Sequence, residues 1–153
     1  MSDTAETEHM ESVVERVLVP VDGTAVDAVD YAVAIADSYD ATVHAVFVLS
    51  ESTVRDLETG VTDRDRVADR TADVLEGVRA TCDAADLPVS TAMTYGFSTR
   101  RKRRHPGSAI LDTAEDIDAD FLVVPREEDH TTGVLARVAK FVLQYASQPV
   151  LSV

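Results

Sequence analysis

The sequence is short of the residues that form covalent cross-links and metal clusters. Among its 153 residues, Cys82 is the single cysteine, and tryptophan is absent. One cysteine excludes an intramolecular disulfide bond and any metal site with several thiolate ligands. No run of 18 apolar residues is present, which excludes a membrane-spanning helix. The first 14 residues lack the basic and apolar regions of a signal peptide. We therefore expect a disordered polar tail over residues 1–13 and a cytoplasmic protein.

Lysine is also scarce, and the chain is strongly acidic. Lys102 and Lys140 are the two lysines, and 28 Asp and Glu against 14 Lys and Arg give a formal net charge of −14. An acidic surface that prefers arginine to lysine resembles proteins from the salt-loaded cytoplasm of haloarchaea, where salt screens the repulsion between carboxylates. The alternative is an ordinary acidic protein. Because the phosphate backbone of nucleic acids attracts cations, this charge argues against general nucleic-acid binding.

Five apolar, β-branched runs alternate with four stretches of helical periodicity. This alternation predicts a single doubly wound α/β domain over residues 14–153, with a five-stranded parallel sheet and helices on both faces. The expected strands are residues 16–21, 41–49, 88–95, 120–124 and 148–153. Strand 88–95 is the most polar of the five, as expected for an edge strand. Residues 50–62 and 97–105 are expected to form loops.

The helical stretches each carry an apolar stripe. We expect Val26, Val29, Val33 and Ala36 to face inward on the first helix, and Val67, Thr71, Val74, Val78 and Cys82 on the second, which covers residues 63–85. The third helix is expected to begin near Pro106, a favoured first helical position, and to bury Ile110, Ala114 and Ile117. The fourth is expected to bury Val134, Leu135, Val138, Val142 and Tyr145.

Four segments resemble the universal stress protein family. They are VLVPVDGT at 17–24, ATVHAVFVL at 41–49, PGSAILDTAEDIDADFLVV at 106–124 and FVLQYASQPVLSV at 141–153. The spacing between them also matches the family, so the resemblance covers nearly the whole chain from Val14. It implies the strand order 3-2-1-4-5 and a homodimer that pairs through the last strand, here Val150, Leu151, Ser152 and Val153. The segment is apolar and uncharged, and such unprotected edges favour pairing with another copy.

Many members of that family bind ATP through a glycine-rich loop after strand four. The pattern is Gly, two residues, Gly, nine residues, Gly, then Ser or Thr, and its backbone N–H groups approach the phosphates. In this chain Pro125 and Glu128 stand at the first two glycine positions, and Ala136 and Arg137 at the last pair. Seven residues separate Glu128 from Ala136, so the loop is two residues short, and Gly133 has the wrong offset. Pro125 also lacks an N–H, and the acids at 127–129 would repel a triphosphate.

Two functional interpretations of this altered site remain open. The resemblance places the degenerate nucleotide site at Asp22, Gly23, Val43, Pro125, Arg126, Glu128, Gly133, Ala136 and Arg137. In the family the acid at the position of Asp22 contacts the ribose or base. Here Asp22 either keeps that role or simply caps the first helix in a turn with Gly23 and Thr24. The favoured interpretation is a non-enzymatic stress-response module without a cofactor. The alternative is a protein that binds ATP or AMP through Asp22 and the altered loop, with slow ATPase activity.

A basic run interrupts the acidic sequence at Arg100, Arg101, Lys102, Arg103 and Arg104. This run carries +5, whereas the other 28 acids and nine Lys or Arg carry −19. Three interpretations compete. The run is a solvated loop attracted to the protein's own acidic surface or to a second subunit. It is a docking site for an anionic partner such as phosphate, nucleotide, RNA or an acidic protein. Or it folds over the carboxyl edge of the sheet and supplies the cations that the phosphate loop lacks.

Other chemistry has little support in the sequence. None of His9, His44, His105 and His130 has the spacing of a metal site. His44 lies within a strand, where packing in the core is expected, and the inward-facing Cys82 behaves as a small hydrophobic residue. A Gly-x-Ser-x-Gly nucleophile motif is absent. We therefore expect neither a metal nor a catalytic nucleophile.

Overall fold

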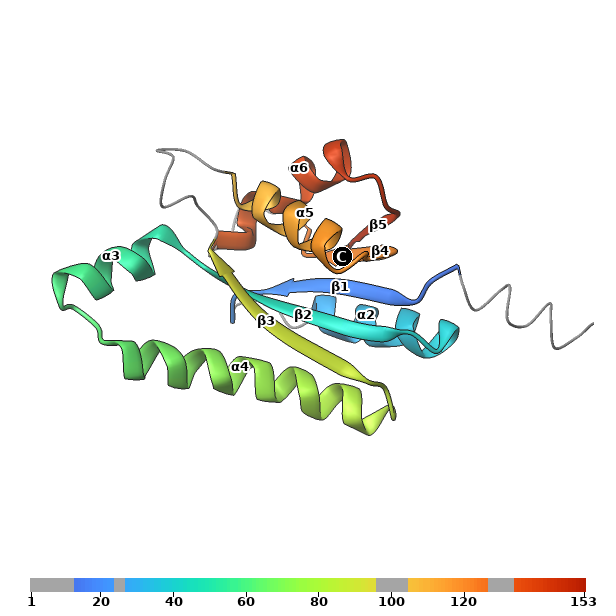
Figure 1. Cartoon of the computed structure of the whole chain (residues 1–153), viewed down its shortest axis with the longest axis horizontal. Helices are drawn as coiled ribbons and strands as arrows, with labels where there is room; N and C mark the ends of the chain where they lie inside the picture. Colours follow the sequence, from blue (N-terminus) through green and yellow to red (C-terminus); the bar gives the residue numbers. More distant parts are fainter. Residues whose placement is uncertain (1–12, 24–26, 96–104, 127–133) are drawn as a thin grey trace, which may run out of the picture.

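The computed structural model describes residues 13–23, 27–95, 105–126 and 134–153. Five parallel strands form one sheet in the order β3-β2-β1-β4-β5, as the family resemblance predicted (Figure 1). The strands are β1 (Arg16–Val21), β2 (Thr42–Leu49), β3 (Val89–Tyr95), β4 (Phe121–Val124) and β5 (Val150–Ser152). The polar strand β3 lies at an edge, as expected, and β5 lies at the opposite edge.

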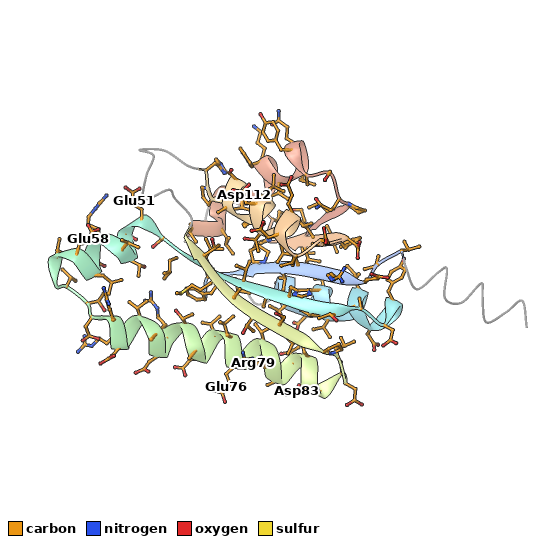
Figure 2. The ribbon with its side chains drawn as sticks, in the orientation of Figure 1. Glu51, Glu58, Glu76, Arg79, Asp83 and Asp112 are labelled. Atoms are coloured by element: carbon orange, nitrogen blue, oxygen red, sulfur yellow. The ribbon has the colours of Figure 1, made fainter. Side chains whose placement is uncertain are left out.

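Helices cover both faces of this sheet (Figure 1). One face is covered by α2 (Asp27–Tyr39) and α4 (Arg64–Ala84), and the other by α5 (Pro106–Asp116) and α6 (Val138–Tyr145). A short 3-10 turn, η1 (Val134–Arg137), leads directly into α6. Arg79 of α4 donates a hydrogen bond to Thr91 Oγ1 of β3 at 2.6 Å, which ties this helix to the edge strand (Figure 2). The chain therefore folds as the doubly wound α/β domain that its alternating pattern predicted.

Side chains of β1 alternate between two hydrophobic cores. Val17, Val19 and Val21 pack with α2 and α4, whereas Leu18 packs with α5, η1 and α6. Both sets are almost completely buried. A strand covered on both faces needs apolar residues at every position, which explains the continuous apolar run in the sequence.

The helical stripes are mostly as predicted. Val67, Thr71, Val78 and Cys82 are buried on α4, and α5 begins at Pro106 with His105 as its N-cap. Tyr145 is the exception, because its side chain is 60% exposed. It occupies the last position of α6 and contacts the ring of Phe141, with the ring centroids 4.7 Å apart. An exposed tyrosine at a helix end keeps its hydroxyl in water.

The expected loop at residues 50–62 is wrong, because most of it forms helix α3 (Glu51–Thr59). The Ser50 hydroxyl caps this helix by accepting the N–H of Thr53 at 3.2 Å. Gly60 ends it in the left-handed conformation with φ 81°. No residue of α3 is buried, so the apolar stripe that would have predicted the helix is missing.

Three aspartates adopt the left-handed backbone conformation just after helices. Asp40 follows α2, Asp86 follows α4 and Asp118 follows α5, with φ of 56°, 56° and 55°. This conformation is unusual for residues with a side chain, although aspartate tolerates it better than most. Each of these turns returns the chain to the amino end of the next strand.

Candidate functional site at the carboxyl edge of the sheet

The sheet has its topological switch point between β1 and β4. The chain leaves β1 toward the face of α2 and leaves β4 toward the face of η1 and α6. In open α/β sheets, ligands bind outside the carboxyl ends of the strands at such a point. Two residue pairs, Val17 with Phe121 and Leu18 with Leu122, define the register of these strands. Asp22 and Pro125 follow the two strands and so lie beside the switch point.

Asp22 is linked to the segment that follows β4. Its Oδ2 atom accepts a hydrogen bond from the backbone N–H of Leu135 at 3.3 Å. The Leu135 side chain is 2% exposed and packs in the core beneath α5 and α6. The Asp22 carboxylate is thus hydrogen-bonded to η1 beside the switch point. The alternative role of Asp22 as a helix cap involves Thr24, which lies outside the described residues.

The first residues after β4 have few backbone donors to offer a ligand. Pro125 is buried and has no N–H. The N–H of Arg126 donates to the carbonyl oxygen of Val153. The N–H of Val153 in turn donates to the carbonyl of Val124 at 3.0 Å. A phosphate at this position would therefore find one donor missing and the next already used.

Val43 does not belong to this edge of the sheet. It pairs with Val17 near the amino end of β1, whereas Asp22 follows Val21, which pairs with Phe47. The residue level with Asp22 is therefore Val48. Val43 and Val48 are separated by roughly 16 Å along the strand, at about 3.3 Å per residue. Placing Val43 in the nucleotide site was wrong, because the carboxyl ends of parallel strands share one edge.

Of the other predicted site residues, some belong to the part of the chain that the structure describes and some do not. Gly23 follows Asp22 with φ 88°, which explains the glycine in this turn. Ala136 and Arg137 are the last two residues of η1, directly before α6. The predictions for Glu128, Gly133 and the basic run Arg100–Arg104 fall outside the described residues, as do residues 1–12 of the predicted tail.

Titratable groups in the interior lie away from this edge. Burial lowers the pKa of His44, and the positive charge of Arg16 lowers it further. His44 is half-buried in β2, where it pairs with Leu18 and Ser90. Burial raises the pKa of the Cys82 thiol, with a smaller contribution from Asp83, so this thiol is a poor nucleophile.

No group of three or more His, Cys, Asp or Glu side chains within residues 13–23, 27–95, 105–126 and 134–153 has the arrangement of a metal site. Within those ranges, no helix is both long and apolar enough to cross a membrane.

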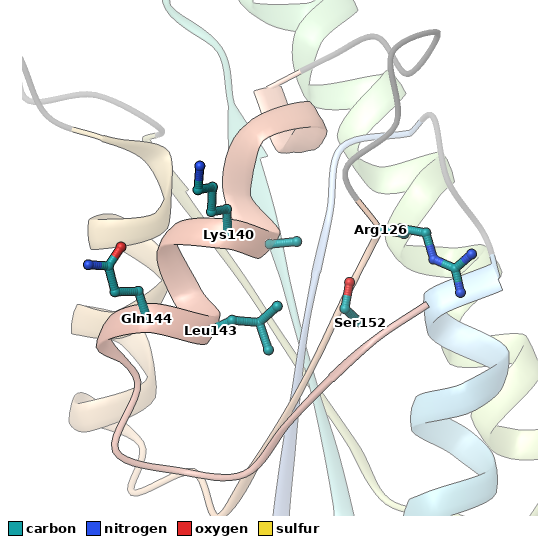
Figure 3. Close-up of a pocket in the computed structure, with 6 residues that line it drawn as sticks. Arg126, Lys140, Leu143, Gln144 and Ser152 are labelled. Carbon is teal, nitrogen blue, oxygen red and sulfur yellow. The ribbon is translucent and has the colours of Figure 1, made fainter.

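A broad hollow of about 510 Å³ lies beside the edge strand β5. It is lined by Arg126, Ala139, Lys140, Leu143, Gln144 and Ser152. Leu143 is 55% exposed and points from α6 toward the strand that carries Ser152 (Figure 3). All of Val150, Leu151, Ser152 and Val153 are partly buried in the single chain. An exposed leucine beside an edge strand is a feature of surfaces that pair with another chain.

The fold and the switch point define a doubly wound α/β protein. A sequence model of the Universal stress protein family matches residues 14–153, and the chain belongs to that family. No curated protein matches the chain.

Solved structures share the fold at low identity. A protein of the universal stress protein family from Burkholderia pseudomallei is 20% identical, covering 93% of this chain and 97% of that one, with a TM-score of 0.67. A universal stress protein in complex with cAMP is 20% identical, with coverage of 92% and 96% and a TM-score of 0.62. The universal stress protein from Archaeoglobus fulgidus in complex with dAMP is 18% identical, with coverage of 92% and 98% and a TM-score of 0.62.

Proposed function

We propose that this protein is a non-enzymatic interaction module of the stress response that acts as a homodimer and does not bind ATP. The main support is the backbone after β4, where Pro125 has no N–H and the N–H of Arg126 is bonded to Val153. The hydrogen bond between Asp22 and Leu135 is a second observation. It engages the carboxylate that the family resemblance assigns to the nucleotide. Because Leu135 is also buried in the core, η1 is anchored at the switch point by both its backbone and its side chain.

The backbone after β4 supports the same conclusion. A polyphosphate site needs several N–H groups that converge on the anion. Pro125 has none, and the Arg126 N–H is bonded to Val153. The adjacent acids at 127–129 add like charge, which opposes a triphosphate.

The direct test is to look for bound nucleotide. The purified protein is denatured and the released small molecules are analysed by mass spectrometry. In parallel, the melting temperature is measured in molar KCl with and without ATP and Mg²⁺, since a ligand that binds only the native state must raise it. We expect no released nucleotide and no shift. Stoichiometric ATP or AMP would contradict the proposal.

An adenine mononucleotide is the second candidate ligand. Two structural relatives were crystallised with cAMP and dAMP, each of which carries one phosphate. A monophosphate needs fewer backbone donors than ATP. Asp22 could accept a hydrogen bond from such a ligand and keep the Leu135 N–H, because a carboxylate offers about four acceptor sites. AMP should then raise the melting temperature of the native protein but not of Asp22→Ala, and slow ATP hydrolysis would be the activity to assay.

The basic run Arg100–Arg104 is the proposed docking site for an anionic partner. Its support is the charge contrast with the rest of the chain. The run carries +5, whereas the 28 acids and the nine remaining Lys and Arg residues together carry −19. Replacing all five residues with serine should abolish any measured affinity for inorganic phosphate or nucleotide. Unchanged affinity would refute this role.

Pairing of β5 with β5 of a second copy is the proposed dimer contact. β5 bonds to β4 on one side and lies last in the sheet order. Leu151→Lys should yield a monomer in size-exclusion chromatography with light scattering at high salt, because it places charge in the apolar contact. Met93→Lys is the matched control, since Met93 is 53% exposed on the opposite edge strand β3. Wild-type protein that is monomeric at low micromolar concentration would contradict the dimer.

The composition supports a salt-rich cytoplasm as the working environment. A net charge of −14 destabilises a compact chain through self-repulsion, and salt screens that repulsion. The free energy of unfolding should therefore rise between dilute buffer and molar KCl.

A further inference from the structure

A second cavity lies between α2 and α4, on the opposite face of the sheet from η1 and α6. Its volume is about 290 Å³, close to the lower end of ligand pockets. Four valines supply its apolar lining: Val21 of β1, Val29 of α2, and Val74 and Val78 of α4. Gly23, Asp30, Asp73, Gly77 and Thr81 complete the wall.

Gly77 keeps this cavity open. It lies in the interior of α4, where a glycine costs about 1 kcal/mol relative to alanine. A Cβ atom at this position would meet no atom within 4 Å, so close packing does not require the glycine. Asp73, Gly77 and Thr81 are spaced four residues apart and share one face of the helix. The Thr81 hydroxyl is occupied, since it donates to the Gly77 carbonyl at 3.0 Å.

The charge of the wall selects the kind of ligand. Asp30 and Asp73 are its charged residues, and none of the nine lining residues is Lys, Arg or His. A cation with an apolar body would place its charge near the carboxylates and its body on the valines. No aromatic ring lines the cavity, so the usual partner of a quaternary ammonium is missing. A primary ammonium can instead donate three hydrogen bonds to carboxylate oxygens.

We propose that the cavity between α2 and α4 binds a small primary alkylammonium ion. The cavity adjoins the carboxyl edge, because Val21 and Gly23 belong to its wall, but it lies between α2 and α4, and its test uses no nucleotide. Asp30 and Asp73 are both exposed, so the ionic contribution is modest and falls with salt.

The test uses n-hexylammonium and the full-length protein in isothermal titration calorimetry at low salt. Two probes of the same chain length serve as ligand controls: hexanol, which has no charge, and hexyltrimethylammonium, which has no N–H donor. Hexylammonium should bind about fivefold more tightly than either control, as expected for contacts with exposed carboxylates. Hexanol or hexyltrimethylammonium that binds equally well would overturn the proposed selectivity.

Variants locate the binding site. Gly77→Leu should abolish hexylammonium binding by filling the cavity, while the helix gains a residue of higher propensity. The double variant Asp30→Asn with Asp73→Asn should bind hexylammonium about fivefold more weakly and hexanol unchanged. Glu76→Gln is the matched control, because Glu76 lies on α4 but points away from the sheet (Figure 2).

Each result is decisive. An equal loss in Glu76→Gln and in the double variant would show general attraction to an acidic surface and refute the site. Undiminished binding by Gly77→Leu with a melting temperature at or above that of the wild type would refute the cavity as the location. Failure of the wild type to bind hexylammonium at millimolar concentration would refute the proposal outright.

Discussion

An aspartate lies at each end of the β1–β4 pair, and the two make different contacts: Asp120 joins the start of β4 to β1, and Asp22 joins the end of β1 to η1. At the amino end, Asp120 Oδ2 accepts the consecutive N–H groups of Glu15 and Arg16 at 2.8 and 3.0 Å. At the carboxyl end, Asp22 Oδ2 accepts the N–H of Leu135 at 3.3 Å. Asp120 therefore accepts two short bonds, whereas the bond that Asp22 accepts from Leu135 is longer.

The contacts of Asp120 and Asp22 are expected to differ in strength. Short hydrogen bonds from two N–H groups to one carboxylate are among the stronger bonds in proteins. A bond of 3.3 Å is at the weak end of the usual range. The contact at the amino end is therefore expected to contribute more to the stability of the fold than the contact at the carboxyl end.

Loss of Asp120 should have the largest effect. Asp120→Ala removes the acceptor of two N–H groups and should lower the free energy of unfolding by about 2–3 kcal/mol, measured by urea denaturation. Asp120→Asn should lose about half as much, because its amide oxygen still accepts but carries no charge. Equal effects of the two substitutions would show that the charge of Asp120 is irrelevant.

Loss of Asp22 should cost less. Asp22→Ala should lower the free energy of unfolding by about 1 kcal/mol, the usual value for one hydrogen bond. The same urea experiment measures it. If Asp22→Ala proved more destabilising than Asp120→Ala, the assignment of the structural role to the amino end would be wrong.

The smallest effect concerns pH at the amino end. Burial and the charge of Arg16 lower the pKa of His44, so the unfolded chain binds this proton more tightly than the folded chain. The contribution of His44 to stability is therefore complete above its ordinary pKa of 6.5 and is lost as the pH falls through the lowered value. Because His44 is only half-buried, the loss should be smaller than the effect of either aspartate substitution.

His44→Gln is the control for this pH dependence. The difference in unfolding free energy between wild type and variant should change between pH 7 and pH 5, with the wild type losing more. A constant difference across that range would show that His44 titrates alike in both states.

The strands could be predicted from the sequence because they are buried on both faces. A continuous apolar run such as residues 16–21 has one structural solution in a chain that alternates strands and helices. Burial also explains the stripe on α4, where Val67, Thr71, Val78 and Cys82 face the sheet. Tyr145 belonged to the same kind of pattern but ends its helix, and position within a stripe does not reveal where the helix stops.

Helix α3 was missed because its stabilising contacts are local and polar. Its N-cap Ser50, the Glu51–Arg55 ion pair at 3.6 Å and the terminal Gly60 are all visible in the sequence as capping signals. A search for apolar periodicity does not detect them. Attention to Ser50 and Gly60 would have suggested a helix between them.

The candidate site was predictable only in part. Asp22 and Pro125 lie at the predicted edge because strand ends determine their position. Asp22 accepts the backbone N–H of Leu135, which lies 113 residues further along the chain. Because every non-proline residue has such an N–H, no pattern of side chains predicts this contact. Val43 was misplaced because the pairing of β2 with β1 decides which end of the strand reaches the edge.

The left-handed aspartates that follow α2, α4 and α5 perform two tasks with one residue. The chain has only six glycines, and Asp40, Asp86 and Asp118 occupy turns where glycine would be the least strained choice. Each also places a carboxylate beside the negative end of a helix dipole. The repulsion between the two is strongest at low salt. Dissolved ions weaken that repulsion, so the turns at the amino end of the sheet should become more favourable as the salt concentration rises.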